Sequence, residues 1–552
     1  MGLQKGEGMK FIIVTGGVVS SLGKGIAASS IGLLLKRRGL SVVIQKFDPY
    51  INVDPGTMSP FQHGEVYVTD DGGETDLDLG HYERFLDQDL TEDQSVTTGK
   101  VYQAVIQRER AGGYLGKTVQ VVPHITDEIK TRIRRGGETV DGDVDVVITE
   151  IGGTTGDIES LPFLEAARQL RLELGADNCL FVHLTLVPYI KAAKEIKTKP
   201  TQHSVKGLQQ IGIQPDILLC RTEVPISAEV RAKIALFCNV QESAVIEARD
   251  VASIYHVPIH LRRDGLDTAI IKALRIAAPE PDLFEWETMV KRMTSITEDV
   301  RIAVVGKYVQ IRDAYKSIIE AFTHAGVSND VHVEVEWIDA EDVENMGAEE
   351  QLAGVHGVLV PGGFGERGIK GKLAAVRYAR EHNVPFLGIC LGLQCAVIEF
   401  ARNVCGIDDA DGSEFNPNTP NPVIDLMEDQ IPEGDKGGTM RLGAYPCLLK
   451  KGTLAQVIYD ADEISERHRH RWEVNNSYRG VFEKNGLVFS GISPDGRLVE
   501  MVELTDHPYF IASQFHPELK SRPNRPHPLF FGLVKSAKVL KENPSSAEQM
   551  SA

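Results

Sequence analysis

KFIIVTGGVVSSLGKGI, residues 10–26, is an apolar run that passes into a glycine-rich turn and then into the start of a helix. Its first part has the length and branching of a buried parallel strand. Gly16 and Gly17 allow backbone conformations that a Cβ would forbid, so consecutive N–H groups can converge on an anion. Gly23 and Lys24 would begin the helix, where free amides and the helix dipole favour negative charge. The stretch therefore predicts a phosphate-binding turn.

The spacing departs from the usual P-loop, in which four residues separate the first glycine from Gly-Lys and a Ser or Thr follows. The interval from Gly17 to Gly23 is one residue longer, and Gly25 stands where the hydroxyl would be. A bound Mg²⁺ therefore needs oxygen ligands from elsewhere in the chain.

Two acidic segments are candidates for supplying these oxygens. Residues 70–80 form either a solvated loop or a hard-cation site, and alternation would place Asp76 and Asp78 on one side of an extended chain. Residues 144–150 resemble a Walker-B strand, because an apolar run ends in Glu150.

Length and composition limit the possible classes of protein. The chain has 552 residues, 42% of them apolar and 25% charged, which indicates a globular protein with two large domains and no membrane-spanning run. The net charge of −19 opposes general binding to nucleic acid. Seven scattered cysteines without C-x-x-C spacing favour a reducing compartment over disulfides or zinc. The start has no apolar signal segment and no Ser or Thr at position six, so we expect a cytoplasmic protein.

The first half alternates strands and helices, which predicts a parallel α/β sheet. A helix is expected to close at residues 36–39, and another at 227–237. Further strands are expected at 41–46, 144–150, 180–187 and 216–220. Lys46 ends one strand and is either solvated or able to reach the phosphates.

Two segments between these elements are functional candidates. Residues 48–65 show neither the helical nor the strand periodicity of apolar residues, which predicts a long loop. Long loops in compact domains are usually functional. Residues 191–206 concentrate lysine in an acidic domain and interleave it with neutral donors, which favours a triphosphate site over a solvated face.

The alternation of strands and helices stops near residue 277. A new α/β domain is expected to begin with strands at 301–306, 331–337 and 357–360. The predicted fold class is α/β with two domains, a P-loop NTPase-like parallel-sheet domain and a second α/β domain. The expected boundaries are 1–277, a linker at 278–300, 301–545, and an unordered tail at 546–552. Residues 408–438 are polar and rich in proline and are expected to be an insertion.

A nucleophile motif lies in the second half. A strand leads into Gly388-Ile-Cys390-Leu-Gly392, the G-x-nucleophile-x-G elbow that exposes its nucleophile at a helix N-terminus. The helix dipole favours the thiolate there. His516 would be the base and Glu518 its orienting acceptor, on one side of an extended segment.

Amides of Gly363 and Leu391 are expected to meet the oxyanion. Residues 468–472 contain two histidines that suggest a metal site, but we expect no acidic or thiolate partner nearby. We therefore interpret this cluster as structural or substrate-orienting.

The motifs at residues 14–25, 197–202 and 388–392 carry a resemblance that extends from Met9 to about Val539. The first half resembles dethiobiotin-synthetase-like ATPases (amidoligases), the second half resembles class I triad glutamine amidotransferases, and together they resemble the CTP synthase family. The resemblance implies a ligase of pyrimidine biosynthesis that phosphorylates UTP at O4 with ATP and Mg²⁺, and then forms CTP with ammonia from glutamine. It also implies activation by GTP, inhibition by CTP, and a homotetramer that can form filaments, with no nucleic-acid or membrane partner.

Site residues follow from the same resemblance, in addition to the triad of Cys390, His516 and Glu518. The implied Mg²⁺ ligands are Asp78 and Glu150. The implied ATP contacts are Ser21, Leu22, Gly23, Lys24, Gly25, Ile26, Asp78, Arg249, Asp250 and Val251. The implied UTP or CTP contacts are Ser20, Asp157, Ile158, Glu159, Lys197, Thr198, Lys199, Pro200, Thr201, Gln202 and Lys233. The implied glutamine contacts are Gly363, Leu391, Gly392, Leu393, Gln394, Glu414 and Arg471.

Two other functions fit parts of this pattern. A cobyrinate-type amidase joins the same two folds but activates a carboxylate, and the lysine-rich stretch at 197–202 argues against it. A switch ATPase or filament scaffold with an inactive glutaminase is the other alternative, and the intact triad argues against it.

Overall fold

The computed structural model describes residues 8–137, 143–426 and 440–543. Its contacts divide the chain into two compact units. The first contains the chain up to Pro55 together with Asp78–Val290, and the second contains Gly56–Leu77 together with the chain from Lys291. The predicted tail at 546–552 lies outside the described residues, as do residues 427–439 of the predicted insertion.

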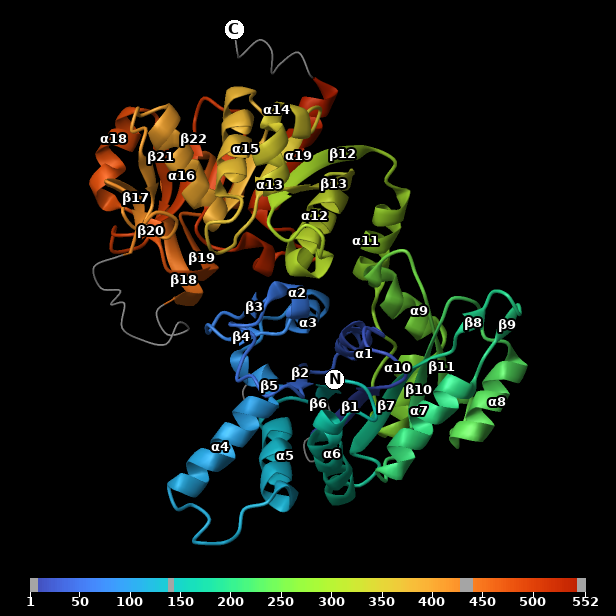
Figure 1. The fold of residues 1–552 in the computed structure, drawn as a ribbon. Coiled ribbons are helices and arrows are strands. Elements are labelled where there is room, and N and C mark those ends of the chain that lie inside the picture. The colour runs from blue at the N-terminus through green and yellow to red at the C-terminus, as the bar shows by residue number, and fades with distance from the viewer. Residues whose placement is uncertain (1–7, 138–142, 427–439, 544–552) are drawn as a thin grey trace. The chain divides into compact units, whose positions relative to one another are not determined.

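A parallel sheet with the order β11-β10-β7-β1-β6-β2-β5 forms the centre of the first unit (Figure 1). Its strands are nearly continuous apolar runs, as expected for strands covered on both faces. Their bounds are β1 Lys10–Gly16, β2 Val42–Asp48, β5 Ser95–Thr97, β6 Val146–Ile151, β7 Cys179–Leu186, β10 Ile217–Thr222 and β11 Val245–Arg249.

Helices pack in two groups around this sheet. In one group, α1 contacts the three other helices. The bounds of this group are α1 Lys24–Arg37, α3 Asp78–Leu86, α9 Val257–Arg263 and α10 Leu266–Ala273. The remaining helices are α4 Thr98–Arg110, α5 Thr126–Arg135, α6 Leu161–Leu174, α7 Lys199–Gln210 and α8 Ala228–Cys238. A short hairpin of β8 Tyr189–Ile190 and β9 Glu195–Ile196 precedes α7. Parallel strands end at one edge of the sheet, so their following loops meet there.

The second unit has a mixed sheet with the order β13-β12-β14-β15-β23-β22-β21-β18-β19. The pairs from β13 to β23 are parallel and the later ones antiparallel. Their bounds are β12 Asp299–Gly306, β13 His332–Asp339, β14 Gly357–Val360, β15 Phe386–Ile389, β18 Arg441–Leu449, β19 Glu463–His470, β21 Leu487–Ile492, β22 Val499–Leu504 and β23 Phe510–Ser513.

Two hydrophobic clusters occupy opposite faces of this sheet. One is built by α13 Ala340–Met346, α14 Ala348–Gln351, α15 Ile369–Glu381, α16 Leu391–Asn403 and α18 Arg479–Lys484. The other is built by α12 Lys316–Ser328, α17 Leu454–Tyr459 and α19 Pro528–Glu542. The connecting helix α11 spans Phe284–Ser295.

The predicted strands and helices are confirmed to within about two residues at most boundaries, including the helix that ends at Arg37. The predicted insertion is instead partly built into the second unit. It contains β16 Ala410–Gly412 and β17 Asn421–Asp425, which join β20 Glu473–Val474 in a small sheet. Ala410, Val423 and Ile424 are buried against α16, which explains why the two strands form within a mostly polar segment.

The segment Gly56–Leu77 belongs by sequence to the first half but packs in the second unit. It was predicted as a loop to residue 65, and it also contains α2 Pro60–His63 and the hairpin of β3 Tyr67–Val68 and β4 Glu74–Thr75. Ser59 caps α2 by accepting a hydrogen bond from the Phe61 amide.

Candidate active sites

The cysteine elbow forms as the sequence predicts. Strand β15 ends at Ile389, and Cys390 adopts φ 54° and ψ −101° before α16 begins at Leu391. Positive φ at a non-glycine residue stores strain, a feature that clusters at active sites. Gly392 is required by close packing, since an added Cβ would lie 3.1 Å from the Val360 carbonyl carbon.

His516 and Glu518 lie beside this cysteine. The His516 Nδ1 is 2.8 Å from Glu518 Oε1, so the carboxylate can orient the imidazole. The extended segment expected for this pair is wrong, because Pro517–Lys520 forms a 3₁₀ turn that brings the two side chains together. Burial lowers the pKa of His516, but the Glu518 carboxylate and the Cys390 thiol outweigh it and raise the pKa to about 10. The site therefore favours a protonated imidazole beside Cys390.

The loop after β14 brings Gly363 next to the elbow. A Cβ on Gly363 would lie 3.5 Å from Leu391 Cδ2, so the two predicted oxyanion residues are neighbours. Lys307 Nζ donates to the Phe364 carbonyl at 3.0 Å, and Lys372 Nζ donates to the Pro361 carbonyl at 3.0 Å. Two lysine side chains thus hold carbonyls on either side of Gly363.

The predicted glutamine contacts cluster around the same loop. Glu414 Oε1 accepts a hydrogen bond of 2.7 Å from the Gly365 amide, and burial raises the pKa of Glu414. The Arg471 guanidinium is near enough to oppose that rise. Gln394 donates from Nε2 to the Trp472 carbonyl at 3.2 Å, which fixes the first turn of α16. Gly392 and Leu393 lie in that turn.

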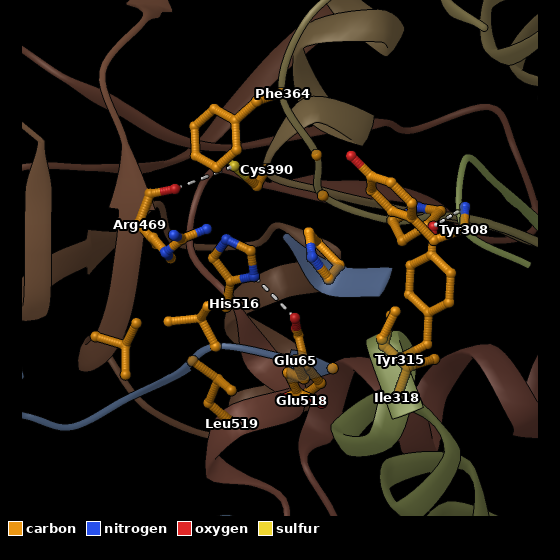
Figure 2. Close-up of a pocket in the computed structure, with 18 of the residues that line it drawn as sticks. Glu65, Tyr308, Tyr315, Ile318, Phe364, Cys390, Arg469, His516, Glu518 and Leu519 are labelled. Atoms are coloured by element: carbon orange, nitrogen blue, oxygen red, sulfur yellow. Dashed lines mark hydrogen bonds and ion pairs between the residues drawn. The ribbon is translucent and has the colours of Figure 1, made fainter. Parts of the chain in front are cut away.

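A cavity of about 210 Å³ lies at this site and includes Cys390, His516 and Gly363 in its lining. Figure 2 shows His516 joined to Glu518 and the Cys390 sulfur facing the Arg469 carbonyl. The Gly56–Leu77 segment supplies much of the wall, through Gly56, Thr57, Met58, Pro60, Gly64, Glu65, Val66 and Val68. The sequence analysis did not connect this segment to the cysteine.

Two arginines anchor the segment over the cavity. Arg467, fully buried, forms an ion pair with Asp70 and donates to the Tyr67 hydroxyl at 3.0 Å. Arg469 donates to Glu74 at 2.7 Å and to the Gly56 carbonyl at 3.0 Å. Alternation along β19 puts both arginines on one face, a signal that could have suggested a shared partner.

The histidine cluster differs from its expectation. His468 and His470 are in contact at 2.9 Å, and the carboxylates of Glu500 and Glu473 lie 3.6 Å from their rings. The expectation that no acid lies nearby is therefore wrong, because β22 brings Glu500 in from elsewhere in the sequence and Glu473 lies only three residues after His470. Burial and the Arg441 charge lower the pKa of both histidines, so the pair is neutral.

In the first unit, β1 leads into the glycine turn and α1. Gly23 is the N-cap of α1 with φ 96°, and Val18 and Ser21 also have positive φ. Lys24 Nζ donates to the Gly153 carbonyl at 2.7 Å. Burial lowers the pKa of Lys24, while the Glu150 carboxylate opposes the shift. The turn thus presents a desolvated ammonium near an acid.

Asp78 and Glu150 converge on the Lys46 ammonium, which lies 3.0 Å from Glu150 Oε1 and also forms an ion pair with Asp78. Lys46 is therefore buried among acids rather than solvated. An added Cβ at Gly25 would lie 2.6 Å from Asp78 Cγ, so the Asp78 carboxylate fills the place of the missing P-loop hydroxyl.

The expected pairing of Asp76 with Asp78 on an extended chain is wrong. Asp78 begins α3, where an acid is favoured by the helix dipole, and Asp76 instead lies 3.2 Å from His63. Among the described residues no group of three or more His, Cys, Asp or Glu side chains could hold a metal. Two carboxylates still fit Mg²⁺, which commonly takes its other oxygens from water and substrate phosphates.

A cavity of about 400 Å³ joins the predicted ATP segments. Its lining includes Leu22, Gly23, Ile26, Arg249, Asp250 and Val251. Arg221 also lines it and was missed by the sequence analysis. Its guanidinium donates to the carbonyls of Ser21 at 3.2 Å and Leu22 at 3.0 Å, and to Asp250 at 2.9 Å. Arg221 thus joins the two halves of the pocket.

The predicted pyrimidine contacts lie on separate segments of the first unit. Lys199, Pro200, Thr201 and Gln202 open α7, and Gln202 donates to Thr198 Oγ1 at 3.1 Å. Hydrogen bonding to Lys197, and then the charges of Lys197 and Lys233, lower the pKa of Glu195, so these ammonium groups are neighbours.

The loop after β6 completes this group. Asp157 accepts a hydrogen bond of 2.7 Å from the Thr154 amide, and Ile158 and Glu159 begin an exposed 3₁₀ turn. Thr155 donates from its amide to the Gly16 carbonyl at 2.8 Å, which ties this loop to the glycine turn that includes the exposed Ser20.

Comparison with known proteins agrees with this architecture. Residues 10–276 match the family model described as CTP synthase N-terminus, and residues 310–536 match glutamine amidotransferase class-I. A CTP synthase of Clostridium perfringens is 61% identical over 528 residues, which are 96% of this chain and 98% of the relative. The chain belongs to the CTP synthase family.

Other matches are similar in extent or narrower. A CTP synthase of Caldanaerobacter subterraneus is 60% identical over 534 residues, covering 97% of this chain and 99% of the relative. The solved glutaminase domain of a Trypanosoma brucei CTPS with bound acivicin is 38% identical, with a TM-score of 0.42, and covers 44% of this chain and 94% of that one. In the described residues, no helix is long and apolar enough to cross a membrane.

Proposed function

We propose that this chain is a glutamine-hydrolysing CTP synthase, a ligase that aminates UTP to CTP with ATP and with ammonia released from glutamine. The observation that most strongly supports it is the meeting of Cys390, His516 and Glu518 in one cavity of a chain from this family. The described geometry then suggests a role for each group.

In the glutaminase reaction, the Cys390 thiolate attacks the side-chain amide of glutamine. His516 holds the proton and passes it to the leaving ammonia, while Glu518 keeps the imidazole in the correct tautomer. The amides of Gly363 and Leu391 stabilise the oxyanion. Glu414 and Arg471 have charges suited to the α-ammonium and α-carboxylate of glutamine.

In the synthetase reaction, Lys24 neutralises charge on the transferred phosphoryl group, and the amides that open α1 hold the ATP phosphates. Asp78 and Glu150 would hold Mg²⁺, which would supply neutralising charge for the phosphates when bound. Lys46 stands between these acids and forms an ion pair with each of them. The Arg249–Val251 side of the cavity receives the rest of ATP.

The stretch from Lys197 to Gln202, together with Lys233 and Ser20, supplies the cations and hydroxyls that a UTP triphosphate needs. Asp157 and Glu159 accept from the 4-amino group of CTP but find no donor at the keto oxygen of UTP, so the same loop distinguishes product from substrate. We also propose, from family membership alone, activation by GTP, inhibition by CTP, and a cytoplasmic homotetramer that can form filaments. The domain boundaries at 1–277, 278–300, 301–545 and 546–552, which rest on the sequence pattern, remain a prediction.

The decisive experiment measures CTP by absorbance with glutamine or with ammonium chloride as the nitrogen source. Cys390→Ala removes the nucleophile, so glutamine-dependent synthesis and glutamine hydrolysis disappear while ammonia-dependent synthesis remains. Lys24→Ala should abolish synthesis from both nitrogen sources but leave basal glutamine hydrolysis.

Omission controls test the substrates. Turnover of ATP that does not need UTP would contradict the proposal and favour another amidase. Glutamine use by Cys390→Ala, or CTP formation by Lys24→Ala at the wild-type rate, would contradict the assignment of each site. A glutamine-like diazo ketone should label wild-type protein at Cys390 and leave the Cys390→Ala variant unlabelled.

A further inference from the structure

A buried histidine links the glycine turn to the helix that bears the lysine-rich stretch. His183, on β7, is fully buried. Its Nδ1 lies 2.9 Å from Thr15 Oγ1 at the end of β1, and its Nε2 lies 2.7 Å from Ser204 Oγ on α7. Both ring nitrogens therefore have a hydroxyl partner, and the ring joins two segments that are far apart in the sequence.

The same residues pack tightly against the turn. An added Cβ at Gly17 would lie 3.0 Å from Ser204 Cβ and 3.3 Å from His183 Cε1. Gly17 therefore allows α7 to approach the backbone of the turn directly. The turn itself contains Val18 and Ser21 at positive φ, a conformation that persists only when surrounding structure supports it.

The imidazole remains neutral in this position. Burial, and then the nearby Lys24 charge, lower the pKa of His183 to about 3. A neutral ring has one donor and one acceptor nitrogen, which two hydroxyl groups satisfy in either tautomer. It therefore bridges the segments without adding a positive charge next to Lys24.

We propose that His183 is a positioning residue for UTP, holding the glycine turn with Ser20 at the correct distance from the Lys197–Gln202 stretch. The inference rests on the proposed function, because it needs both segments to bind UTP. Thr201 supports the same placement, since its Oγ1 donates to the Leu186 carbonyl of β7 at 2.9 Å. Arg221 joins the two sides of the ATP pocket separately, so we expect this pocket to be retained when the His183 link is lost.

The test uses ammonia-dependent CTP synthesis to obtain the KM for UTP and the KM for ATP. Ser204→Ala removes one hydroxyl without adding an atom, and His183→Asn retains a polar atom near Nδ1 but loses the reach to Ser204. Both should raise the KM for UTP roughly tenfold, as loss of one buried hydrogen bond would, and leave the KM for ATP unchanged within about twofold. His183→Gln reaches further and should restore part of the loss.

Two controls separate positioning from general damage. Ser29→Ala removes another buried hydroxyl, which donates to the Gly25 carbonyl within α1, and should leave the KM for UTP unchanged. If Ser204 acts through His183, the double variant His183→Asn/Ser204→Ala should be no worse than His183→Asn alone. Additive losses, equal rises in both KM values, or an unchanged KM for UTP in both single variants would overturn the inference.

Lys199→Ala separates this inference from the proposed function. A raised KM for UTP in Lys199→Ala, with no rise in Ser204→Ala, would refute only the role of His183. An unchanged KM for UTP in Lys199→Ala would instead contradict the proposed UTP site. Basal glutamine hydrolysis and the Tm, measured on each variant, show that the protein is folded.

Discussion

Replacing Gly25 with alanine tests whether Asp78 occupies the place of the P-loop hydroxyl. The new Cβ would lie 2.6 Å from Asp78 Cγ, whereas carbon atoms in contact are normally about 3.5–4.0 Å apart. The carboxylate must therefore move by about 1 Å, and a misplacement of that size can cost roughly a hundredfold in rate. CTP synthesis should fall by about this factor with glutamine and with ammonium chloride alike.

The glutaminase reaction provides the internal reference for this variant. Basal glutamine hydrolysis should be unchanged, because Cys390 lies in the other unit. Gly480→Ala is a matched control, since an added Cβ in α18 meets nothing within 4 Å, and it should retain wild-type synthesis. If Gly25→Ala makes CTP from ammonia within about twofold of wild type, Asp78 has no role at the transferred phosphate and the reasoning is refuted.

Three further results are expected. Glu518→Gln removes the charge that raises the pKa of His516 to about 10, so burial should lower the pKa of His516, and glutamine hydrolysis should fall by at least about a hundredfold. In the wild type, the stability that this pair contributes is present below the ordinary histidine pKa of 6.5 and is lost as pH rises through about 10. Measuring the Tm against pH would test this loss. Arg221→Ala should raise the KM for ATP several-fold with little change for UTP, and equal changes would contradict its place in the ATP pocket. Glu159→Ala should raise the inhibition constant for CTP more than it raises the KM for UTP. Equal changes in the two constants would contradict this role of Glu159.

Local patterns in the sequence predicted the features that depend on neighbouring residues. The elbow at Cys390 follows from a strand, two glycines and a helix start within a few residues, and the structure has that order. The two-domain α/β class is also confirmed, because alternating apolar strands and helices leave few other arrangements.

Features that depend on distant packing were missed. Arg221 lies near the end of β10 with no motif around it, and only the fold brings it to the Leu22 carbonyl. Asp78 was expected on an extended chain, but helix α3 begins there. This helix start was missed because a single acid at the start of a helix has no distinctive spacing in the sequence. Glu500 reaches His468 from β22, which periodicity within one segment does not reveal, whereas Glu473 follows His470 by only three residues.

The placement of Gly56–Leu77 in the second unit affects the order in which the chain can fold during synthesis. This segment leaves the ribosome early, yet its partners Arg467 and Arg469 follow about 400 residues later. Its contacts close very long loops, so its docking is expected to be a late and slow step. A gene fragment that begins at Lys291 would lack this segment, and its glutaminase cavity would be open to water on that side.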